Sequence, residues 1–220
     1  MPVRKIPKNY RNVTGVHASD KSIGDAQFES TLERDFLTLL EFHPDVERFE
    51  VQPKVIHWKD ASGKQRKHTP DVLVLFKPDL KLTPWLCEIK YRSDIFENWF
   101  QYKPKFKAGI RHAKTLGWRY RLINDVEVRT PYLSNCRFLT GFKFQKPREH
   151  DINLLLERLA HLGQSTPAAL LSSIEPDKYA QAKKSLPDPL IFVIPQIALV
   201  TKQLKIRFYF DHHSYVFLQR

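Results

Sequence analysis

Two short apolar runs that border acidic residues constrain the fold of this chain more than any other feature. Residues 72–76 (VLVLF) follow Asp71 directly, and residues 85–87 (WLC) precede Glu88. Runs of this length, separated by a proline-bounded loop over 78–84, are typical of buried strands. Because a charge on a buried strand is costly unless it is paired or binds a metal, both acids are candidates for a functional site.

The segment 88–90 (EIK) has the alternation of a strand. Glu88 and Lys90 are two residues apart, so their side chains point to one face while Ile89 points into the core. If the strand over about 85–91 pairs with the one over about 65–76, Asp71 lies near Glu88. A Glu-x-Lys sequence alone is more often an ion pair on a solvated face, and only the buried flanks favour a catalytic cluster here.

Two carboxylates and an ammonium group on one patch suit phosphodiester cleavage. Asp71 and Glu88 offer the oxygen ligands that a hard cation such as Mg²⁺ prefers, and Mn²⁺ can substitute. The cation polarises the scissile phosphate and lowers the pKa of bound water. Lys90 then orients or deprotonates that water, or offsets charge on the transition state. These three residues therefore predict the catalytic centre of a metal-dependent nuclease.

A third acid is expected from a helix over about 28–42, in which Leu32, Phe36 and Leu40 recur at helical spacing. Glu33 borders this apolar stripe, where a carboxylate is out of place. It either reaches solvent or pairs with a cation such as Lys90, or it supplies a further metal ligand; we favour the ligand. Glu29, one turn earlier, is the alternative acid.

Basic residues predict a polyanionic partner. The chain of 220 residues has 36 Lys and Arg against 24 Asp and Glu, a formal net charge of +12, which favours nucleic acid. No acid occurs from 101 to 123, within and after a helix expected over about 95–116 that ends at Gly117. We expect this helix to contact the DNA backbone, although a solvated face is the alternative; the candidate residues are Lys103, Lys105, Lys107, Arg111 and Lys114.

The remaining pattern predicts an α/β fold with a mixed sheet in a nuclease domain over 25–144. Its other strands are expected over 48–52, continued through 55–58, and over 118–123. Residues 1–24 are expected to be an irregular basic arm that is either frayed or neutralises phosphates; its cations are Arg4, Lys5, Lys8 and Arg11.

A composition change near 145–148 predicts a C-terminal domain over 145–220. Helices over 151–162, 167–174 and 191–204, followed by a hairpin over 205–218 with His212-His213-Ser214 near its tip, suggest a winged-helix-like domain that binds a partner. A helical cap on the first domain is the alternative.

Other classes of protein are disfavoured. The two cysteines, Cys87 and Cys136, form no disulfide framework, which predicts a reducing, cytoplasmic location. No apolar run approaches the roughly 20 residues of a membrane span, and residues 1–12 lack the apolar core of a signal peptide. The histidines are scattered and no Cys-x-x-Cys pair occurs, which disfavours a zinc site. The sequence also lacks the phosphate-binding Gly-rich loop of an ATPase.

The motifs together resemble the TnsA family of the PD-(D/E)xK nuclease superfamily. The resemblance covers residues 28–125 and is carried by Leu32-Glu33-Arg34-Asp35-Phe36, Gln52-Pro53, Thr69-Pro70-Asp71-Val72-Leu73 and Glu88-Ile89-Lys90-Tyr91. It implies a restriction-endonuclease-like core with an active site at Glu33, Asp71, Glu88 and Lys90.

The resemblance also implies a role in cut-and-paste transposition. TnsA proteins cut the 5′, non-transferred strand at transposon ends, beside a TnsB transposase and a TnsC ATPase regulator that contacts the C-terminal domain. Two other readings stay open. A restriction or junction-resolving nuclease with the same core would cut DNA alone, and a DNA-binding adaptor with a degenerate nuclease fold would not cut; intact Asp71, Glu88 and Lys90 disfavour the adaptor.

Overall fold

The computed structural model describes residues 13–60, 62–141, 149–165, 167–173, 205–209 and 215–219. The chain divides into two compact units, Met1–Leu133 and Ser134–Arg220. The expected border between domains at 144/145 falls within 142–148, outside the described residues. Within the described parts of the chain, no helix is both long and apolar enough to span a bilayer.

A mixed four-stranded sheet forms the centre of the first unit. Its order is β3 (Val46–Val51), β6 (Val72–Phe76), β7 (Trp85–Ile89) and β8 (Arg119–Ile123). The first two pairings are antiparallel, while β8 runs parallel to β7. A parallel neighbour needs a crossover, which the helices between β7 and β8 provide. The predicted mixed α/β class is confirmed.

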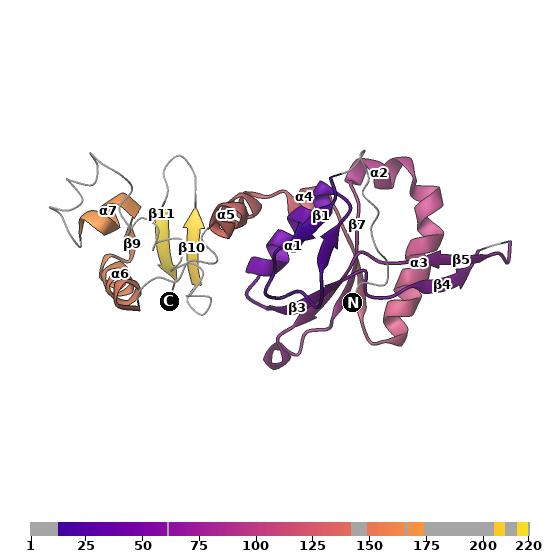
Figure 1. Ribbon diagram of the computed structural model, residues 1–220, viewed down its shortest axis with the longest axis horizontal. Coiled ribbons are helices and arrows are strands. Elements are labelled where there is room, and N and C mark those ends of the chain that lie inside the picture. Colours follow the sequence, from indigo (N-terminus) through magenta and orange to yellow (C-terminus); the bar gives the residue numbers. More distant parts are fainter. Residues whose placement is uncertain are drawn as a thin grey trace. The chain divides into compact units, whose positions relative to one another are not determined.

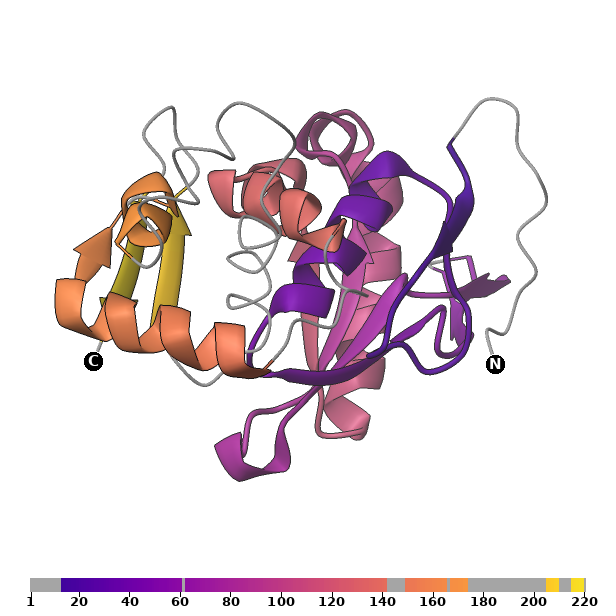
Figure 2. The same cartoon turned by 60° about the vertical axis from the view of Figure 1, so that its left-hand side comes forward.

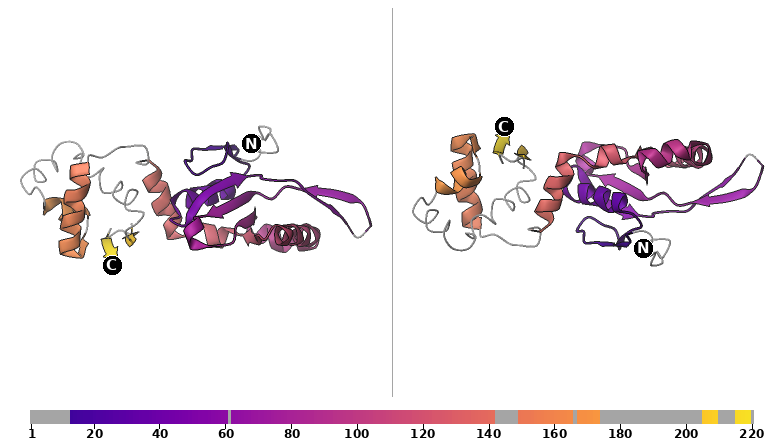
Figure 3. Two further views of the ribbon diagram at one scale, coloured as in Figure 1. Left: turned by 90° about the horizontal axis from the view of Figure 1, so that it is seen from below. Right: turned by 90° about the horizontal axis from the view of Figure 1, so that it is seen from above.

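Helices cover both faces of this sheet (Figure 3). Helix α1 (Thr31–Phe42) packs Leu32, Phe36 and Leu37 onto one face, against Val72 and Val74. On the other face, α3 (Trp99–Thr115) contributes Ala113 to a smaller cluster with Ile56, Leu73 and Leu86. The successive residues of β6 and β7 alternate between these two clusters, as the period of a strand requires.

Helix α1 begins later than expected, at Thr31, because Ser30 has extended backbone angles and its side chain accepts the N–H of Glu33. It ends at Phe42; His43 is extended, as is usual before proline. The segment before α1 forms a hairpin of β1 (Gly15–His17) and β2 (Ala26–Phe28), so the prediction of an irregular segment to residue 24 is wrong for 15–17. The cations of the arm at 4–11 lie outside the described residues.

Two expected long strands are each interrupted, and the prediction was wrong there. β3 ends at Val51, where Gln52 has a positive φ of 49° and Pro53 follows. β5 (Gln65–His68) is separated from β6 by 69–71 and pairs instead with β4 (Ile56–Lys59). Proline lacks the N–H that a central strand needs, so Pro53 and Pro70 mark both interruptions. The result is a two-stranded ribbon outside the main sheet (Figure 1).

The helical region after β7 is also divided. Asn98 lies between α2 (Arg92–Glu97) and α3 with φ −111° and ψ 22°, outside the helical region. α3 ends as expected before Gly117, which has a φ of 70°. A Cβ at Gly109 would lie 2.4 Å from the Tyr120 ring, so only glycine lets α3 pack this closely on β8. Between β6 and β7 the loop contains the short helix η1 (Pro78–Leu80).

Two helices that the sequence pattern did not reveal follow β8: α4 (Asp125–Val128) and α5 (Pro131–Thr140). The second unit then has α6 (Glu149–Leu162), β9 (Gln164–Ser165), α7 (Pro167–Ser172), β10 (Lys205–Tyr209) and β11 (Tyr215–Gln219). Its sheet order is β10-β11-β9, all antiparallel, with α6 beside it (Figure 2). The expected hairpin is confirmed. The helix expected over 191–204 and His212-His213-Ser214 lie outside the described residues, so the winged-helix-like arrangement stays a prediction.

Candidate active site

The pairing of β6 with β7 brings Asp71 beside Glu88. The register matches Val72 with Cys87 and Leu73 with Leu86, so Asp71 stands one step further along, opposite Glu88. The Asp71 N–H donates to the Cys87 carbonyl at 3.0 Å. The Asp71 Oδ2 in turn accepts the Ile89 N–H at 2.6 Å, so both backbone and side chain of Asp71 are held against β7.

Lys90 completes the cluster on the same side of β7. Its Nζ lies 3.1 Å from Glu88 Oε1 and 3.5 Å from Asp71 Oδ2, and it donates to the Ile89 carbonyl at 2.9 Å. Ile89 itself is 3% exposed in the α1-side core. The expected alternation of 88–90 is therefore confirmed, and the three residues Asp71, Glu88 and Lys90 converge.

Two further side chains enclose Glu88, and the sequence pattern did not reveal their place. Lys105 Nζ lies 2.7 Å from Glu88 Oε1, the oxygen that also contacts Lys90. His68 Nε2 lies 2.9 Å from Glu88 Oε2, without the alignment of a hydrogen bond. Glu88 is only 1% exposed, so these cations and the imidazole take the place of water around it.

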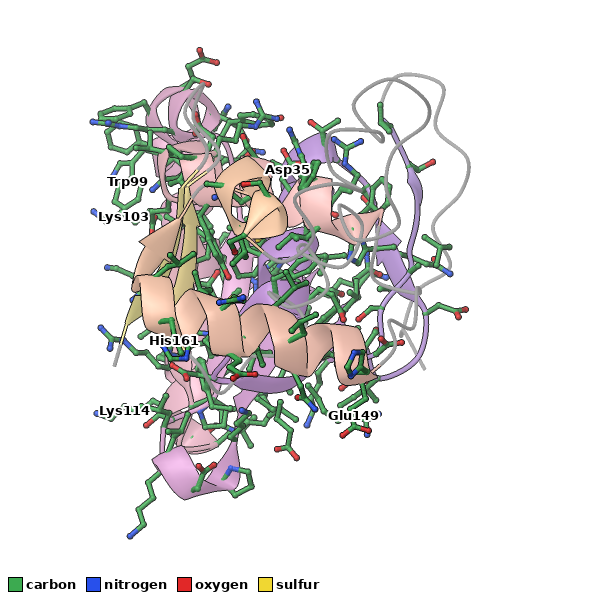
Figure 4. All side chains as sticks on the ribbon, turned by 90° about the vertical axis from the view of Figure 1, so that its left-hand side faces the viewer. Asp35, Trp99, Lys103, Lys114, Glu149 and His161 are labelled. Atoms are coloured by element: carbon green, nitrogen blue, oxygen red, sulfur yellow. The ribbon has the colours of Figure 1, made fainter. Side chains whose placement is uncertain are left out.

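Lys105 was expected on the DNA-facing surface of its helix, but in the structure it points inward and pairs with Glu88. A signal for this exists in the sequence, because Lys105 adjoins Phe106 and precedes Ala108 and Gly109 on the face of α3 that packs against the sheet. The other expected contacts form an exposed stripe, and Figure 4 shows two of them, Lys103 and Lys114, along one edge of the domain; the full set is Lys103, Lys107, Arg111 and Lys114.

Glu33 is placed at the first turn of α1, where it forms a variant of the capping box with the N-cap Ser30 and the preceding Glu29. Its Oε2 accepts the Glu29 N–H at 2.8 Å and its Oε1 accepts the Ser30 hydroxyl at 3.0 Å. Burial raises the pKa of Glu33 despite these hydrogen bonds and the charge of Lys90. Glu29 instead accepts the Gln52 amide at 3.2 Å. The charge of Glu33 thus raises the pKa of both Lys90 and Asp71. Its two oxygens accept hydrogen bonds at the N-terminal end of α1.

Asp71 and Glu88 differ in electrostatic state. Burial, together with the charge of Glu88, raises the pKa of Asp71 to about 8. Burial also disfavours ionised Glu88, but His68 and the charges of Lys90 and Lys105 lower its pKa to about 2. For Lys90, burial would lower the pKa, yet the two acids raise it above its ordinary value. At neutral pH the cluster therefore holds an ionised Glu88, a protonated Asp71 and an ammonium at Lys90.

A hydrogen-bonded network fixes the chain directly after Lys90. The Tyr91 hydroxyl lies 3.0 Å from the Thr31 hydroxyl, and Arg129 donates to both. Arg129 Nε also lies 3.3 Å from Oδ2 of Asp35, which is labelled in Figure 4. Asp35 is 1% exposed. The network ties the end of β7 to α1 and α4. In the sequence, the one indication of this network is the charged Asp35 within the apolar stripe of its helix.

The donor set fits a magnesium ion, which the site would bind through few protein ligands. In the described part of the chain, no three His, Cys, Asp or Glu side chains lie close enough together to form a metal cage. Mg²⁺ does not require one, because it keeps several waters and uses one or two carboxylates together with substrate phosphates. Asp71 and Glu88 supply two carboxyl groups, Asp71 partly buried at 18% exposed and Glu88 buried at 1%, and burial raises the pKa of Asp71 to about 8 although Lys90 lies beside it.

A mixed sheet between helices, with an acid facing an acid-x-lysine strand, is a restriction-endonuclease-like core. Comparison with protein families identifies the type more closely: residues 43–125 match the family described as TnsA-like endonuclease, N terminal. This segment is similar to the N-terminal domain of TnsA-like endonucleases, a similarity that supports a nuclease role in Tn7-like transposition. The match includes Asp71, Glu88 and Lys90 and begins after Glu33. No curated protein matches the chain.

Proposed function

We propose that the chain is a Mg²⁺-dependent DNA endonuclease that cuts the 5′, non-transferred strand at transposon ends during cut-and-paste transposition. It would act on double-stranded DNA in the bacterial cytoplasm, beside a TnsB-like transposase and a TnsC-like ATPase regulator. The observation that carries the proposal is the convergence of Asp71, Glu88 and Lys90 inside the TnsA-like domain.

Asp71 and Glu88 would hold the ion, with Glu33 as a further acid from α1. An Mg²⁺ ion bound there would polarise the scissile phosphate. Mn²⁺ is expected to substitute. Asp71 must release its proton to act as a ligand, because its pKa is about 8. Lys105 and Lys90 share one Glu88 oxygen, so they hold the carboxylate in place before the ion arrives.

The electrostatics favour one of the roles open to Lys90. A general base must be neutral, whereas the raised pKa of Lys90 keeps it an ammonium. Its Nζ, 3.1 Å from Glu88, is therefore suited to stabilise negative charge that develops on the phosphoryl group. The exposed cations of α3, Lys103, Lys107, Arg111 and Lys114, would hold the DNA backbone beside the site.

The test is strand cleavage of labelled transposon-end DNA with Mg²⁺, with and without the partner transposase. We expect Asp71→Ala to abolish cuts at the 5′ ends while cuts at the 3′ ends persist. Asp79→Ala is the matched control, because Asp79 is an exposed acid in η1.

Two outcomes would overturn parts of the proposal. If Asp71→Ala cut the 5′ ends as well as the unchanged protein does, Asp71 would be structural and the site misassigned. If the chain alone cut the DNA at specific positions, it would be a stand-alone nuclease of the restriction or resolvase type. Neither outcome depends on the winged-helix-like domain.

A further inference from the structure

The ribbon of β4 and β5 extends from the nuclease domain and is packed only at its base. Its pairing runs from Ile56 opposite His68 to Lys59 opposite Gln65. Ile56 is 4% exposed and belongs to the core beneath α3, whereas β5 is exposed from Gln65 to Lys67. Figures 1 and 3 show the ribbon continuing past α3, away from the main sheet. An extension that is packed only at its base contributes little to the stability of the domain, which indicates a surface for a partner.

The charges of the ribbon identify the chemistry of that partner. Alternation places His57, Lys59, Gln65 and Lys67 on one face, all of them exposed and all able to donate hydrogen bonds. Arg66 adds an exposed cation on the other face, and Lys64 adds one at the turn. A surface of donors and cations without large exposed apolar side chains suits a phosphate backbone rather than a hydrophobic partner.

The single acid of the ribbon does not offset this charge at the exposed face. Asp60 Oδ1 accepts the N–H groups of Ser62 and Lys64 at 2.9 Å and 3.1 Å, which shapes the turn. Its Oδ2 lies 2.8 Å from Arg66 Nε. Both oxygens of Asp60 are thus directed to the turn and to Arg66, and Lys59 and Lys67 keep their charge for an external anion.

The base of the ribbon is anchored at the cleavage site. His68 ends β5 and contacts Glu88 at 2.9 Å, and Asp71 follows three residues later in the chain. Gln65 lies about 10 Å from His68, since a strand rises ~3.3 Å per residue. DNA rises ~3.4 Å per base pair, so the exposed face, which begins at Lys67 beside His68, reaches about three base pairs from the scissile phosphate at Gln65.

We propose that the β4–β5 ribbon is a DNA arm, which lies in a groove of the duplex within about three base pairs of the cut and neutralises the phosphates there. The major groove of B-DNA accepts a two-stranded ribbon, and Lys59 and Lys67 stand on the face that would meet its wall. The inference rests on the proposed function, because its occupant is the DNA that the site cuts.

The first test measures binding of the full chain to duplex DNA in EDTA, at several salt concentrations. We expect Lys59→Gln/Lys67→Gln to weaken binding on the order of tenfold and to reduce the salt slope by roughly 2, about 1 for each lost phosphate contact. Lys77→Gln/Lys81→Gln is the matched control, which removes two exposed lysines from the η1 loop. Equal losses in both pairs would overturn the proposal, because net charge alone would then account for binding.

The second test locates the arm on DNA. Cys87 and Cys136 are both buried, so Gln65→Cys introduces an accessible thiol for a photocrosslinker. We expect crosslinks about three base pairs from the cleavage position on transposon-end DNA, in the presence of the partner transposase. Asp79→Cys, in η1, is the control and should not crosslink there. Crosslinks from both positions, or from neither, would overturn the proposal.

These readouts separate the two proposals from each other. Neither binding in EDTA nor crosslinking requires catalysis, so a ribbon that binds and crosslinks in a protein that never cuts would overturn the nuclease function alone. A protein that cuts the 5′ ends while the lysine pairs behave alike would overturn the DNA arm alone.

Discussion

The two faces of the central sheet differ in what they bury: one is apolar and the other holds a charged cluster. On the α1 face, β3, β6 and β7 contribute a continuous apolar layer that includes Phe49, Val72 and Val74, each at most 1% exposed. On the α3 face the apolar cluster is small, and next to it Glu88 is equally buried at 1% but surrounded by Lys90, Lys105 and His68.

The difference shows how one sheet serves both stability and chemistry. The residues of β7 that point to α1, Cys87 and Ile89, pack in the apolar cluster. On the α3 face, Glu88 occupies a position where an apolar side chain would pack, and it is tolerated because its partners replace water. We therefore expect the α1 face to dominate stability and the α3 face to respond to charge and pH.

The largest effect is expected from Phe49→Ala on the α1 face. Phe49 is fully buried opposite Val74, and truncation leaves a cavity that costs roughly 3–5 kcal/mol of unfolding free energy. Urea unfolding measures it. Phe100→Ala is the control, since Phe100 is 89% exposed and should change stability by less than about 0.5 kcal/mol. Equal effects would mean that the α1 layer is not the main core.

A smaller loss is expected from Glu88→Gln on the α3 face. Gln leaves the ammonium groups of Lys90 and Lys105, which share Glu88 Oε1, without a counter-charge, at a cost of roughly 2–3 kcal/mol near pH 7. The lowered pKa of Glu88, about 2 against 4.5, sets the pH dependence. Its stabilisation is present above pH 4.5 and is lost as the pH falls through 2.

The comparison for Glu88 uses Glu47→Gln, an exposed acid of β3. Unfolding by urea at pH 7 and at successively lower pH should show a difference between the two variants that shrinks below pH 4.5. A difference that stays constant with pH would mean that Glu88 contributes through its shape rather than its charge.

The sequence was informative wherever a signal is local. The alternation of Glu88, Ile89 and Lys90 predicted which side chain points to the site, and His43-Pro44 and Gly117 predicted the ends of α1 and α3. These features depend on the period of a strand or on backbone angles, which neighbouring residues determine.

The rest depends on partners distant in the chain, which no local pattern encodes. The run over 65–76 reads as one strand, yet β5 pairs with β4 and β6 pairs with β3. His68 and Lys105 reach Glu88 from another sheet and from a helix; the spacing around Lys105 indicates a position near the packed face of α3 but does not identify Glu88 as its partner. For this reason Lys105 was predicted to contact DNA, whereas in the structure it pairs with Glu88.

Asp71→Asn is expected to have a smaller effect of opposite sign. The unfolded chain releases this proton near pH 3.8, while the folded chain retains it to about pH 8. Ionised Asp71 thus favours the unfolded state increasingly between these values, and Asn removes that cost. We expect a gain in stability at pH 8 that shrinks as the pH falls and disappears near pH 4, measured by thermal unfolding across pH.

Asp79→Asn is the control for Asp71, because its exposed carboxyl should give no such gain. The same samples test the metal proposal: Mg²⁺ should raise the Tm of the unchanged protein and not that of Asp71→Asn. If Asp71→Asn were less stable at pH 8, the ion pair of Asp71 with Lys90 would outweigh the cost of its burial.

The smallest stability effect is expected from Glu33→Gln, which separates a structural acid from a catalytic one. Glutamine closes a capping box as glutamate does, so the free energy of unfolding should change by less than about 0.5 kcal/mol. Glu33 is a proposed metal ligand, and its charge bears on both Asp71 and Lys90. We therefore expect cleavage with Mg²⁺ to fall on the order of tenfold, as loss of one charged ligand implies.

Glu29→Gln is the matched variant, because Glu29 is the alternative acid and accepts the Gln52 amide. Loss of cleavage in Glu29→Gln alone would move the third acid to Glu29. Full cleavage in both variants would leave Glu33 as a capping residue only, and Asp71 and Glu88 would be the complete acidic set. In that case the α1 face would contribute stability and no chemistry, and the division between the two faces of the sheet would be complete.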